Sequence, residues 1–215
     1  MALRAVLFDF SGTLFRLEHE ALEEHGDLMR ALTAPVGVAE GLTPEIEDLW
    51  LRRDLDAEVH RDVHVVALQA AGLTGPGAAL AFYERLVSAA YWQTYPDTFE
   101  ALRTVSEAGL RVAVVSNTGW NIRAVLDRFG VSHLVDEVVL SYEEGLIKPD
   151  PKIFLLACER LRVDPSEVLM VGDSEEADGG AAAVGSRVAI VEPLRTAERP
   201  TALVDSLRKH GIIPV

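Results

Sequence analysis

With 215 residues, of which 49% are hydrophobic, the chain is long enough to fold as one good-sized domain with a substantial core. Its formal net charge of −14 argues against a nucleic-acid partner, because phosphate backbones are bound by clusters of lysine and arginine. Asp9 interrupts the N-terminal apolar run, and no run approaches bilayer-spanning length, so we expect a cytoplasmic protein without a signal peptide or a membrane partner.

Five short runs rich in valine, isoleucine and leucine have the pattern of strands buried on both faces. In chain order they are AVLFDF (5–10), RVAVVSN (111–117), EVVLS (137–141), EVLMVGD (167–173) and RVAIVE (187–192). Helical patterns lie between strands at 98–109, 121–130 and 150–161. The last helix has Asp150 as its expected N-cap and Pro151 at its first position. This alternation predicts an α/β fold with a Rossmann-like, doubly wound parallel sheet.

The segment between the first and second strands is too long for a single crossover and contains helical patterns only. These patterns cover 18–32, 44–55, 57–72 and 78–92. We therefore expect an all-helical cap, residues 16–93, inserted into an α/β core that comprises residues 1–15 and 94–215. An insert joined by two adjacent linkers can move as a lid.

Two further features of this insert bear on the site. We expect its joints with the core near Phe15–Leu17 and near Tyr95–Pro96. The loop at 33–44, TAPVGVAEGLTP, contains several glycine and proline residues and could lie over the site as a specificity loop.

Ligands of open α/β sheets bind beyond the carboxyl ends of the strands, so the polar residues there mark the candidate site. The first strand is followed by Asp9, Ser11, Gly12 and Thr13, and the second by Ser116 and Asn117. The fourth strand is followed by Asp173, Ser174 and Asp178. Lys148, one of three lysines in the chain, precedes the helix at 150–161. Each residue alone is typical of a turn or a helix cap, but the ordered set indicates a site.

These residue types suit phosphoryl chemistry. Asp9 and Asp173, from different strands, can share a Mg²⁺ ion through carboxylate oxygens. An ionised aspartate can also attack phosphorus and form an aspartyl-phosphate. Ser116 and nearby backbone N–H groups can bind phosphate oxygens, and Lys148 can neutralise further charge. A small phosphorylated substrate is thereby compatible with an acidic protein.

The segments DFSGTL, VVSN, IKPDP and VGDSEEAD together resemble the four motifs of the haloacid dehalogenase-like (HAD) hydrolase superfamily, over essentially the whole chain. The resemblance implies a Rossmann-like core with a helical cap inserted after the first motif. It implies a Mg²⁺-dependent phosphatase or phosphotransferase that acts on a small phosphorylated metabolite. It also assigns roles as follows: Asp9 as nucleophile; Asp9, Asp173 and the Ser11 carbonyl as Mg²⁺ ligands; Ser116, Asn117, Gly12 and Thr13 at the phosphate; Lys148 beside the nucleophile and the phosphoryl group; and Asp178 and Ser174 as outer support of the metal.

The chain departs from the family pattern at Ser11. Family phosphatases usually carry a second aspartate there, which protonates the leaving group and then activates water. A serine hydroxyl does not titrate near neutral pH, and loss of a positioned acid or base typically costs about 10²–10⁴ in rate. We therefore expect slower turnover and a preference for good leaving groups, such as acyl or aryl phosphates.

Two alternatives to a phosphatase follow from the same motifs. One is a 2-haloacid dehalogenase, in which Asp9 forms an ester; the metal-binding Asp173 argues against it, since halide displacement needs no Mg²⁺. The other is a catalytically decayed module that binds a phosphate ligand or a partner. A phosphonatase is strongly disfavoured, because the insert at 16–93 contains no lysine for a Schiff base. We expect a monomer or a homodimer, and the sequence does not identify the substrate.

Three other residues in the chain could carry chemistry and are interpreted as structural. His60 and His64 lie four residues apart on a predicted helix, and without an evident third ligand they are interpreted as a helix face rather than a metal site. Cys158 is interpreted as a small buried helix residue.

Overall fold

The computed structural model describes residues 2–19, 22 and 43–213. The expected helix at 18–32 and the expected loop at 33–44 lie almost entirely outside these residues. Among the described residues, no helix is both long enough and apolar enough to cross a bilayer.

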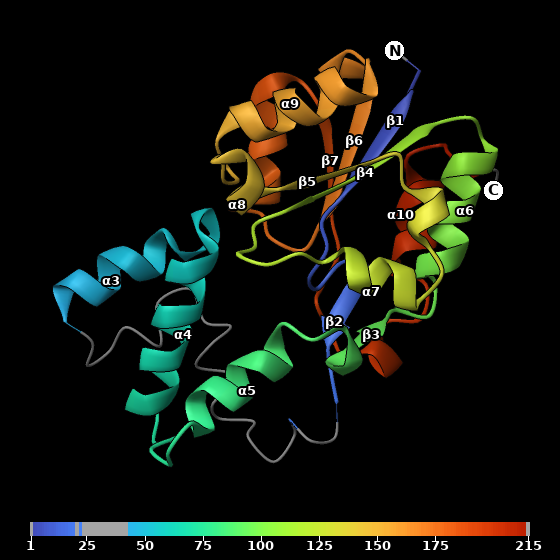
Figure 1. Cartoon of the computed structure of the whole chain (residues 1–215). Coiled ribbons are helices and arrows are strands. Elements are labelled where there is room, and N and C mark those ends of the chain that lie inside the picture. The colour runs from blue at the N-terminus through green and yellow to red at the C-terminus, as the bar shows by residue number, and fades with distance from the viewer. Residues whose placement is uncertain (1, 20–21, 23–42, 214–215) are drawn as a thin grey trace.

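A five-stranded parallel sheet forms the centre of the molecule (Figure 1). Its strands are β1 (Ala5–Phe8), β4 (Arg111–Ser116), β5 (Glu137–Leu140), β6 (Val168–Gly172) and β7 (Arg187–Ile190), in the order β5-β4-β1-β6-β7. All four residues of the central strand β1 are buried, as expected of a strand covered on both faces. The prediction of a Rossmann-like parallel sheet built from these five runs is confirmed.

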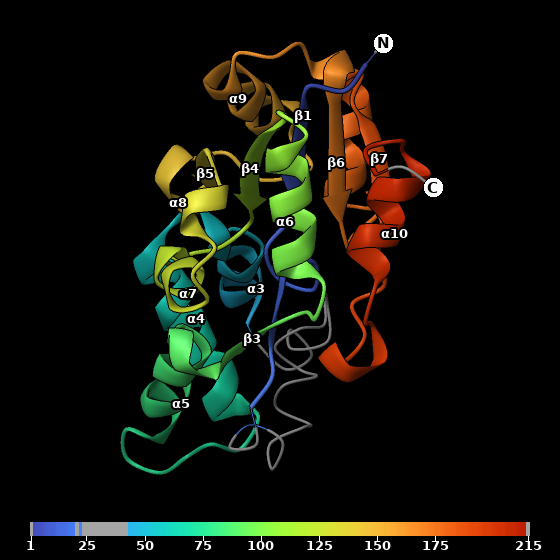
Figure 2. The same ribbon diagram turned by 90° about the vertical axis from the view of Figure 1, so that its right-hand side faces the viewer.

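Helices cover both faces of this sheet. The first face packs on α9 (Pro151–Leu161) and on the 3₁₀ segment η5 (Asp178–Val184). The second packs on α6 (Thr98–Glu107), α7 (Arg123–Arg128) and α10 (Ala202–Lys209), and Figure 2 shows α6 and α10 in front of the strands. Shorter elements of the core are η3 (Ser132–Leu134), α8 (Ser141–Glu144), η4 (Pro165–Glu167) and η6 (Thr196–Glu198).

The start of α9 confirms the expected capping. The Asp150 carboxylate accepts a hydrogen bond from the Lys152 backbone N–H at 2.9 Å, and Pro151 occupies the first helical position. This cap fixes where α9 begins, directly after the segment that carries Lys148.

Within the described part of the chain, the helices between residues 17 and 92 pack around an apolar cluster of their own. They are α3 (Pro44–Leu51), η1 (Arg53–Leu55), α4 (Ala57–Ala70), α5 (Ala78–Leu86) and η2 (Ala89–Tyr91). Trp50, Leu68 and Phe82 are among the buried members of this cluster. We propose that residues 16–93 form a cap on a core of residues 1–15 and 94–215.

The two joints between these helices and the core differ from the expectation of helices only. Residues Phe15–Leu17 form strand β2 and Trp92–Thr94 form strand β3, and the two pair as an antiparallel ribbon. The helix expected to run from 78 to 92 therefore ends at Leu86. The physical reason is that Trp92 packs on Phe10, with ring centroids 4.7 Å apart, which requires extended backbone at the joint. The ribbon ties both linkers together beside β1.

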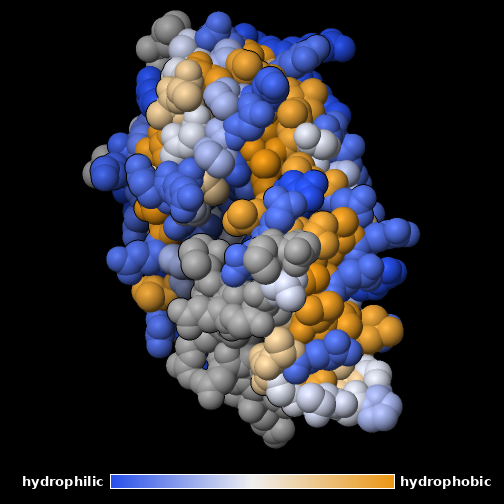
Figure 3. Space-filling view, turned by 90° about the vertical axis from the view of Figure 1, so that its left-hand side faces the viewer, coloured by the Kyte–Doolittle hydropathy of each residue, from blue (hydrophilic) through white to orange (hydrophobic). Residues whose placement is uncertain are grey.

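Large exposed apolar side chains are spread over several elements rather than gathered on one. Those in the described part of the chain are Leu51, Leu80, Phe99, Leu155, Ile190 and Leu194. Figure 3 likewise shows hydrophobic and hydrophilic residues intermixed over the face that it presents. We propose no docking surface from them.

Candidate active site

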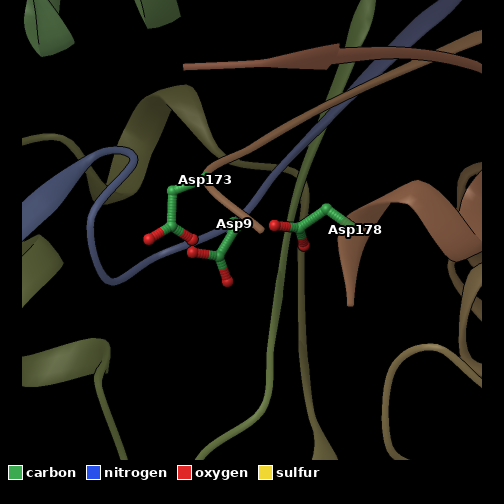
Figure 4. Close-up of side chains that lie close together, drawn as sticks. All are labelled: Asp9, Asp173 and Asp178. Carbon is green, nitrogen blue, oxygen red and sulfur yellow. The ribbon is translucent and has the colours of Figure 1, made fainter. Parts of the chain in front are cut away.

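Three carboxylates from two segments meet at the carboxyl edge of the sheet. Asp9 follows β1, Asp173 follows β6, and Asp178 begins η5. Each offers one oxygen, and these oxygens lie within 4.8 Å of one another. Figure 4 shows the three side chains directed toward a common centre. Carboxylate oxygens at this spacing can share a divalent cation.

Backbone hydrogen bonds explain why these carboxylates meet. The Asp9 N–H donates to the Val171 carbonyl at 2.9 Å, which continues the pairing of β1 with β6 beyond the strand itself. The Ser174 N–H donates to Asp178 Oδ2 at 3.0 Å and closes the turn between β6 and η5. Gly172 has no side chain, and a Cβ atom there would overlap the Asp178 carboxyl group. The turn therefore requires glycine at this position.

Lys148 is buried between two of the carboxylates. Its Nζ donates to Asp9 Oδ1 at 2.7 Å and to Asp178 Oδ1 at 2.6 Å. The Asn117 side chain fixes the Lys148 backbone from both sides: Oδ1 accepts from the Lys148 N–H at 2.8 Å, and Nδ2 donates to its carbonyl at 2.9 Å. Asn117 thus positions the lysine through its side chain, a contact that the motif spacing did not predict.

The charges of this cluster do not balance, since three carboxylates face one lysine. Burial raises the pKa of Asp9 to about 7, against the opposing effect of Lys148. Burial, with the nearby charge of Asp178, raises the pKa of Asp173 to about 6. Burial alone would lower the pKa of Lys148, but Asp9 and Asp178 outweigh it and raise it. The cluster thus carries an excess of negative charge that a bound cation would relieve.

The loop between Asp9 and β2 requires glycine at one position, because the backbone there is left-handed and closely packed. Gly12 has a φ of +79°, and a Cβ atom there would overlap Asp173 Oδ2. Ser11 is exposed, whereas Thr13 is fully buried. The Thr13 hydroxyl has no hydrogen-bond partner among the described residues, so it does not fix the turn as such a residue commonly would. Gly12 lets this loop lie directly against Asp173.

Arg199 secures the same loop from a distant part of the chain, and the motifs gave no signal for it. It is 3% exposed, and its guanidinium donates to the Gly12 carbonyl at 2.6 Å and to the Thr13 carbonyl. The guanidinium also stacks on the Tyr95 ring, 3.2 Å from the ring centroid. An arginine that satisfies backbone carbonyls in this way acts as a structural clamp on the loop.

The opposite side of the sheet edge carries the predicted phosphate-binding residues. Ser116 ends β4 and is buried, and Asn117 follows it. The Thr118 N–H donates to Ser141 Oγ at 2.9 Å, which links the loop after β4 to the start of α8. Ser141 Oγ in turn donates to the carbonyl of Asp54, in η1, at 2.5 Å. The cap turn η1 is thereby attached to this side of the site, as the position of α8 near the upper end of α4 in Figure 1 illustrates.

His60, His64 and Cys158 are all surrounded by protein and lie outside the contacts of the acidic cluster. His60 and His64 are both buried; His60 Nδ1 lies 2.9 Å from the Tyr83 hydroxyl, and His64 Nδ1 lies 2.6 Å from the His60 carbonyl. Cys158 is buried in α9, and burial raises the pKa of its thiol to about 11. A thiol with that pKa is not a nucleophile near neutral pH, so the interpretation of Cys158 as a core residue is confirmed.

The parallel sheet with an acidic cluster at its carboxyl edge places the chain among the α/β proteins, and comparison with known proteins identifies the family. Residues 3–185 match the model of the haloacid dehalogenase-like hydrolases. The chain belongs to this family and is a hydrolase.

The relatives of this chain include both phosphatases and dehalogenases. The chain is 32% identical to glyceraldehyde 3-phosphate phosphatase of Methanopyrus kandleri, over 82% of this chain and 78% of that protein. It is 31% identical to (S)-2-haloacid dehalogenase 4A of Burkholderia cepacia, over 86% of this chain and 80% of that protein. Among solved structures, a HAD phosphatase from Thermococcus onnurineus superposes with a TM-score of 0.61 at 26% identity and covers 99% of this chain and 100% of its own. Overall similarity alone does not separate the two activities.

Proposed function

We propose that the protein is a Mg²⁺-dependent phosphatase or phosphotransferase that acts on a small phosphorylated metabolite through an aspartyl-phosphate at Asp9. The observation that carries this proposal is the arrangement of Asp9 between Lys148 and Asp173, with Asp178 completing the cluster. The phosphatase among the relatives supports it.

The cluster fits a divalent cation on its own chemistry. Clustered carboxylate oxygens with excess negative charge favour Mg²⁺. Burial is the main cause of the raised pKa values of Asp9 and Asp173, and the charge of Asp178 adds to it. We propose Asp9, Asp173 and the Ser11 carbonyl as the ligands, with Asp178 and Ser174 as outer support. When bound, the ion would lessen the repulsion between the attacking carboxylate and the substrate's phosphate.

In this proposal each side chain has one task. The free Asp9 oxygen attacks phosphorus, while Lys148 holds the other oxygen and keeps the carboxylate aligned. Ser116 and the backbone of Asn117, together with the loop of Gly12 and Thr13, bind the phosphoryl oxygens. Asn117 also holds Lys148 through its side chain, so one residue couples phosphate binding to the alignment of the nucleophile.

A second candidate function is dehalogenation of a 2-haloacid, which the dehalogenase among the relatives favours. In that reaction Asp9 attacks carbon and forms an ester, and halide leaves. Asp173 argues for the phosphatase, because a second, half-buried carboxylate beside the nucleophile serves a cation and has no task in halide displacement.

A single set of assays separates these functions. Purified protein is incubated with p-nitrophenyl phosphate, a panel of phosphorylated metabolites or 2-chloropropionate, with Mg²⁺ or with EDTA. We expect release of phosphate that requires Mg²⁺ and that falls by about 10⁴-fold or more in Asp9→Asn. Release of chloride without added metal would instead establish the dehalogenase. Binding of beryllofluoride with Mg²⁺, without turnover of any substrate, would indicate a decayed binding module.

A further inference from the structure

The cap turn that carries Asp54 is attached to the phosphate-binding side of the site. Asp54 lies in the 3₁₀ turn η1, and its carbonyl accepts the hydrogen bond of Ser141 Oγ at 2.5 Å. Ser141 Oγ itself accepts a hydrogen bond from the backbone N–H of Thr118, which lies two residues after Ser116. One hydroxyl therefore connects the backbone of Asp54 to the loop that follows β4.

A second contact fixes the turn beside this loop. Gly119 lies so close to α4 that a Cβ atom there would overlap the His60 side chain. His60 in turn faces Asp54, with 3.7 Å between Nε2 and Oδ1, while its Nδ1 lies 2.9 Å from the Tyr83 hydroxyl. When the Tyr83 hydroxyl donates to Nδ1, the imidazole carries its proton on Nε2 and presents it toward Asp54.

Arg53 Nη2 lies 3.8 Å from Asp54 Oδ2 and His60 Nε2 lies 3.7 Å from Oδ1, and Asp54 also interacts electrostatically with Lys148 and Tyr83. Burial raises the pKa of Asp54, and the nearby charges of Arg53 and Lys148 oppose this effect. The influence of Lys148 shows that Asp54 is within electrostatic reach of the lysine that contacts Asp9. A raised pKa favours the protonated carboxyl group, which is the form that a general acid needs.

The geometry of phosphoryl transfer determines on which side of the phosphorus atom a general acid is needed. In phosphoryl transfer the attacking and leaving oxygens lie roughly in line on opposite sides of phosphorus. Asp9 attacks from the core, so the leaving oxygen faces the cap. Ser11, at the position where family phosphatases usually carry their acid and base, has a hydroxyl that does not titrate near neutral pH.

We propose that Asp54 is the general acid and general base of this hydrolase, in the role that Ser11 cannot fill. This inference rests on the proposed phosphatase function. As Asp9 attacks phosphorus, the bond from phosphorus to the leaving oxygen breaks, and that oxygen takes its electron pair and the proton of the Asp54 carboxyl group. The ionised Asp54 then takes a proton from water as the water oxygen attacks phosphorus. The bond from phosphorus to Asp9 breaks, its electron pair returns to the carboxylate, and Asp54 is protonated again.

This role changes an expectation drawn from the sequence. With Ser11 alone the enzyme would be confined to good leaving groups, whereas an acid on the cap extends it to alkyl phosphates. The preference for aryl phosphates then emerges in the variant without Asp54.

The test measures kcat/KM with Mg²⁺ on p-nitrophenyl phosphate and on glycerol 3-phosphate, an alkyl ester. For Asp54→Asn we expect a loss of about 10²–10⁴-fold on glycerol 3-phosphate and of less than about tenfold on the aryl ester. The matched control is Asp62→Asn, an exposed carboxylate on α4 with 66% of its side chain accessible, which we expect to change neither value by more than about twofold. Introducing Ser11→Asp into Asp54→Asn should restore hydrolysis of glycerol 3-phosphate at least about tenfold.

Each other outcome has a distinct meaning. Equal losses on both esters in Asp54→Asn, without rescue by Ser11→Asp, would show that Asp54 only seats the cap and would overturn the proposal. Unchanged hydrolysis of glycerol 3-phosphate in Asp54→Asn would overturn it as well. If the wild-type protein hydrolyses neither ester while it releases chloride from 2-chloropropionate, the phosphatase assignment itself fails, and this inference fails with it. Thermal unfolding of each variant confirms that the comparison is between folded proteins.

Discussion

The core side and the cap side of the active site are built in different ways. On the core side, Asp9 and Asp173 extend paired strands, and Lys148 is buried and held by hydrogen bonds at both its backbone and its side chain. On the cap side, Asp54 belongs to a three-residue turn attached through one serine hydroxyl and one close glycine contact, over a separate apolar cluster. The difference suggests that the core fixes the reacting atoms, while the cap can be altered with less effect on the rest of the fold.

The largest effect of a single substitution on stability at neutral pH should come from the core side, at Lys148. Replacement by methionine leaves Asp9 and Asp178 buried without their common partner, which typically costs about 3–5 kcal/mol of unfolding free energy. Denaturation by urea measures this loss. Lys152→Met, on the exposed surface of α9, is the control and should stay within about 0.5 kcal/mol of wild type. Equal stability of the two variants would contradict the view of a rigid core side.

A pair of glycines separates backbone conformation from close contact. Gly12→Ala and Gly130→Ala both place a side chain at positive φ, which costs about 1 kcal/mol. Only at Gly12 does the added Cβ overlap Asp173, so we expect a further loss of about 1–3 kcal/mol and weaker Mg²⁺ binding. Urea denaturation and calorimetric titration with Mg²⁺ check both parts. Matching losses in the two variants would mean that the loop moves away from Asp173 at little cost.

The two buried histidines of the cap side should make the stability of the protein depend on pH. Burial lowers the pKa of His60 to about 2 and of His64 to about 4, below the value of about 6.5 in an unfolded chain. As pH falls below 6.5, the unfolded state takes up protons that the folded state does not, so unfolding free energy falls by up to about 1.4 kcal/mol per pH unit for each histidine.

Urea denaturation between pH 7 and pH 4 tests this dependence. The double variant His60→Gln and His64→Gln should lose most of the acid-side slope, whatever its stability at pH 7. His133→Gln, at an exposed position, should keep the wild-type slope. Parallel curves for all three proteins would show that the cap histidines do not govern its stability in acid.

The smallest effect is expected where the two sides meet, at Ser11. Because Asp54 already supplies the proton in our proposal, Ser11→Asp in the otherwise wild-type protein should raise kcat/KM on glycerol 3-phosphate by less than about tenfold. A gain of about 10²-fold or more would show that the wild-type site lacks a general acid. In that case Asp54 does not supply the proton, and the core side is missing a catalytic group at position 11.

The sequence predicts the core side well and the cap side poorly, for a physical reason. Asp9 and Asp173 end strands with a strong apolar pattern, so parallel pairing alone places them together. Asp54 and Arg199 reach the site through the docking of elements far away in the chain, which no local pattern records. The ribbon of β2 and β3 was missed likewise, because the contact of Trp92 with Phe10 overrides the helical pattern before it.

Arg199 has a consequence for how the protein matures during synthesis. The Gly12 carbonyl that it clamps is made 187 residues earlier. While the chain emerges from the ribosome, the first strands can pair, yet the nucleophile's loop lacks its clamp until all five strands of the sheet have been translated. The nascent chain therefore acquires its hydrolytic site late, after the scaffold that will hold it.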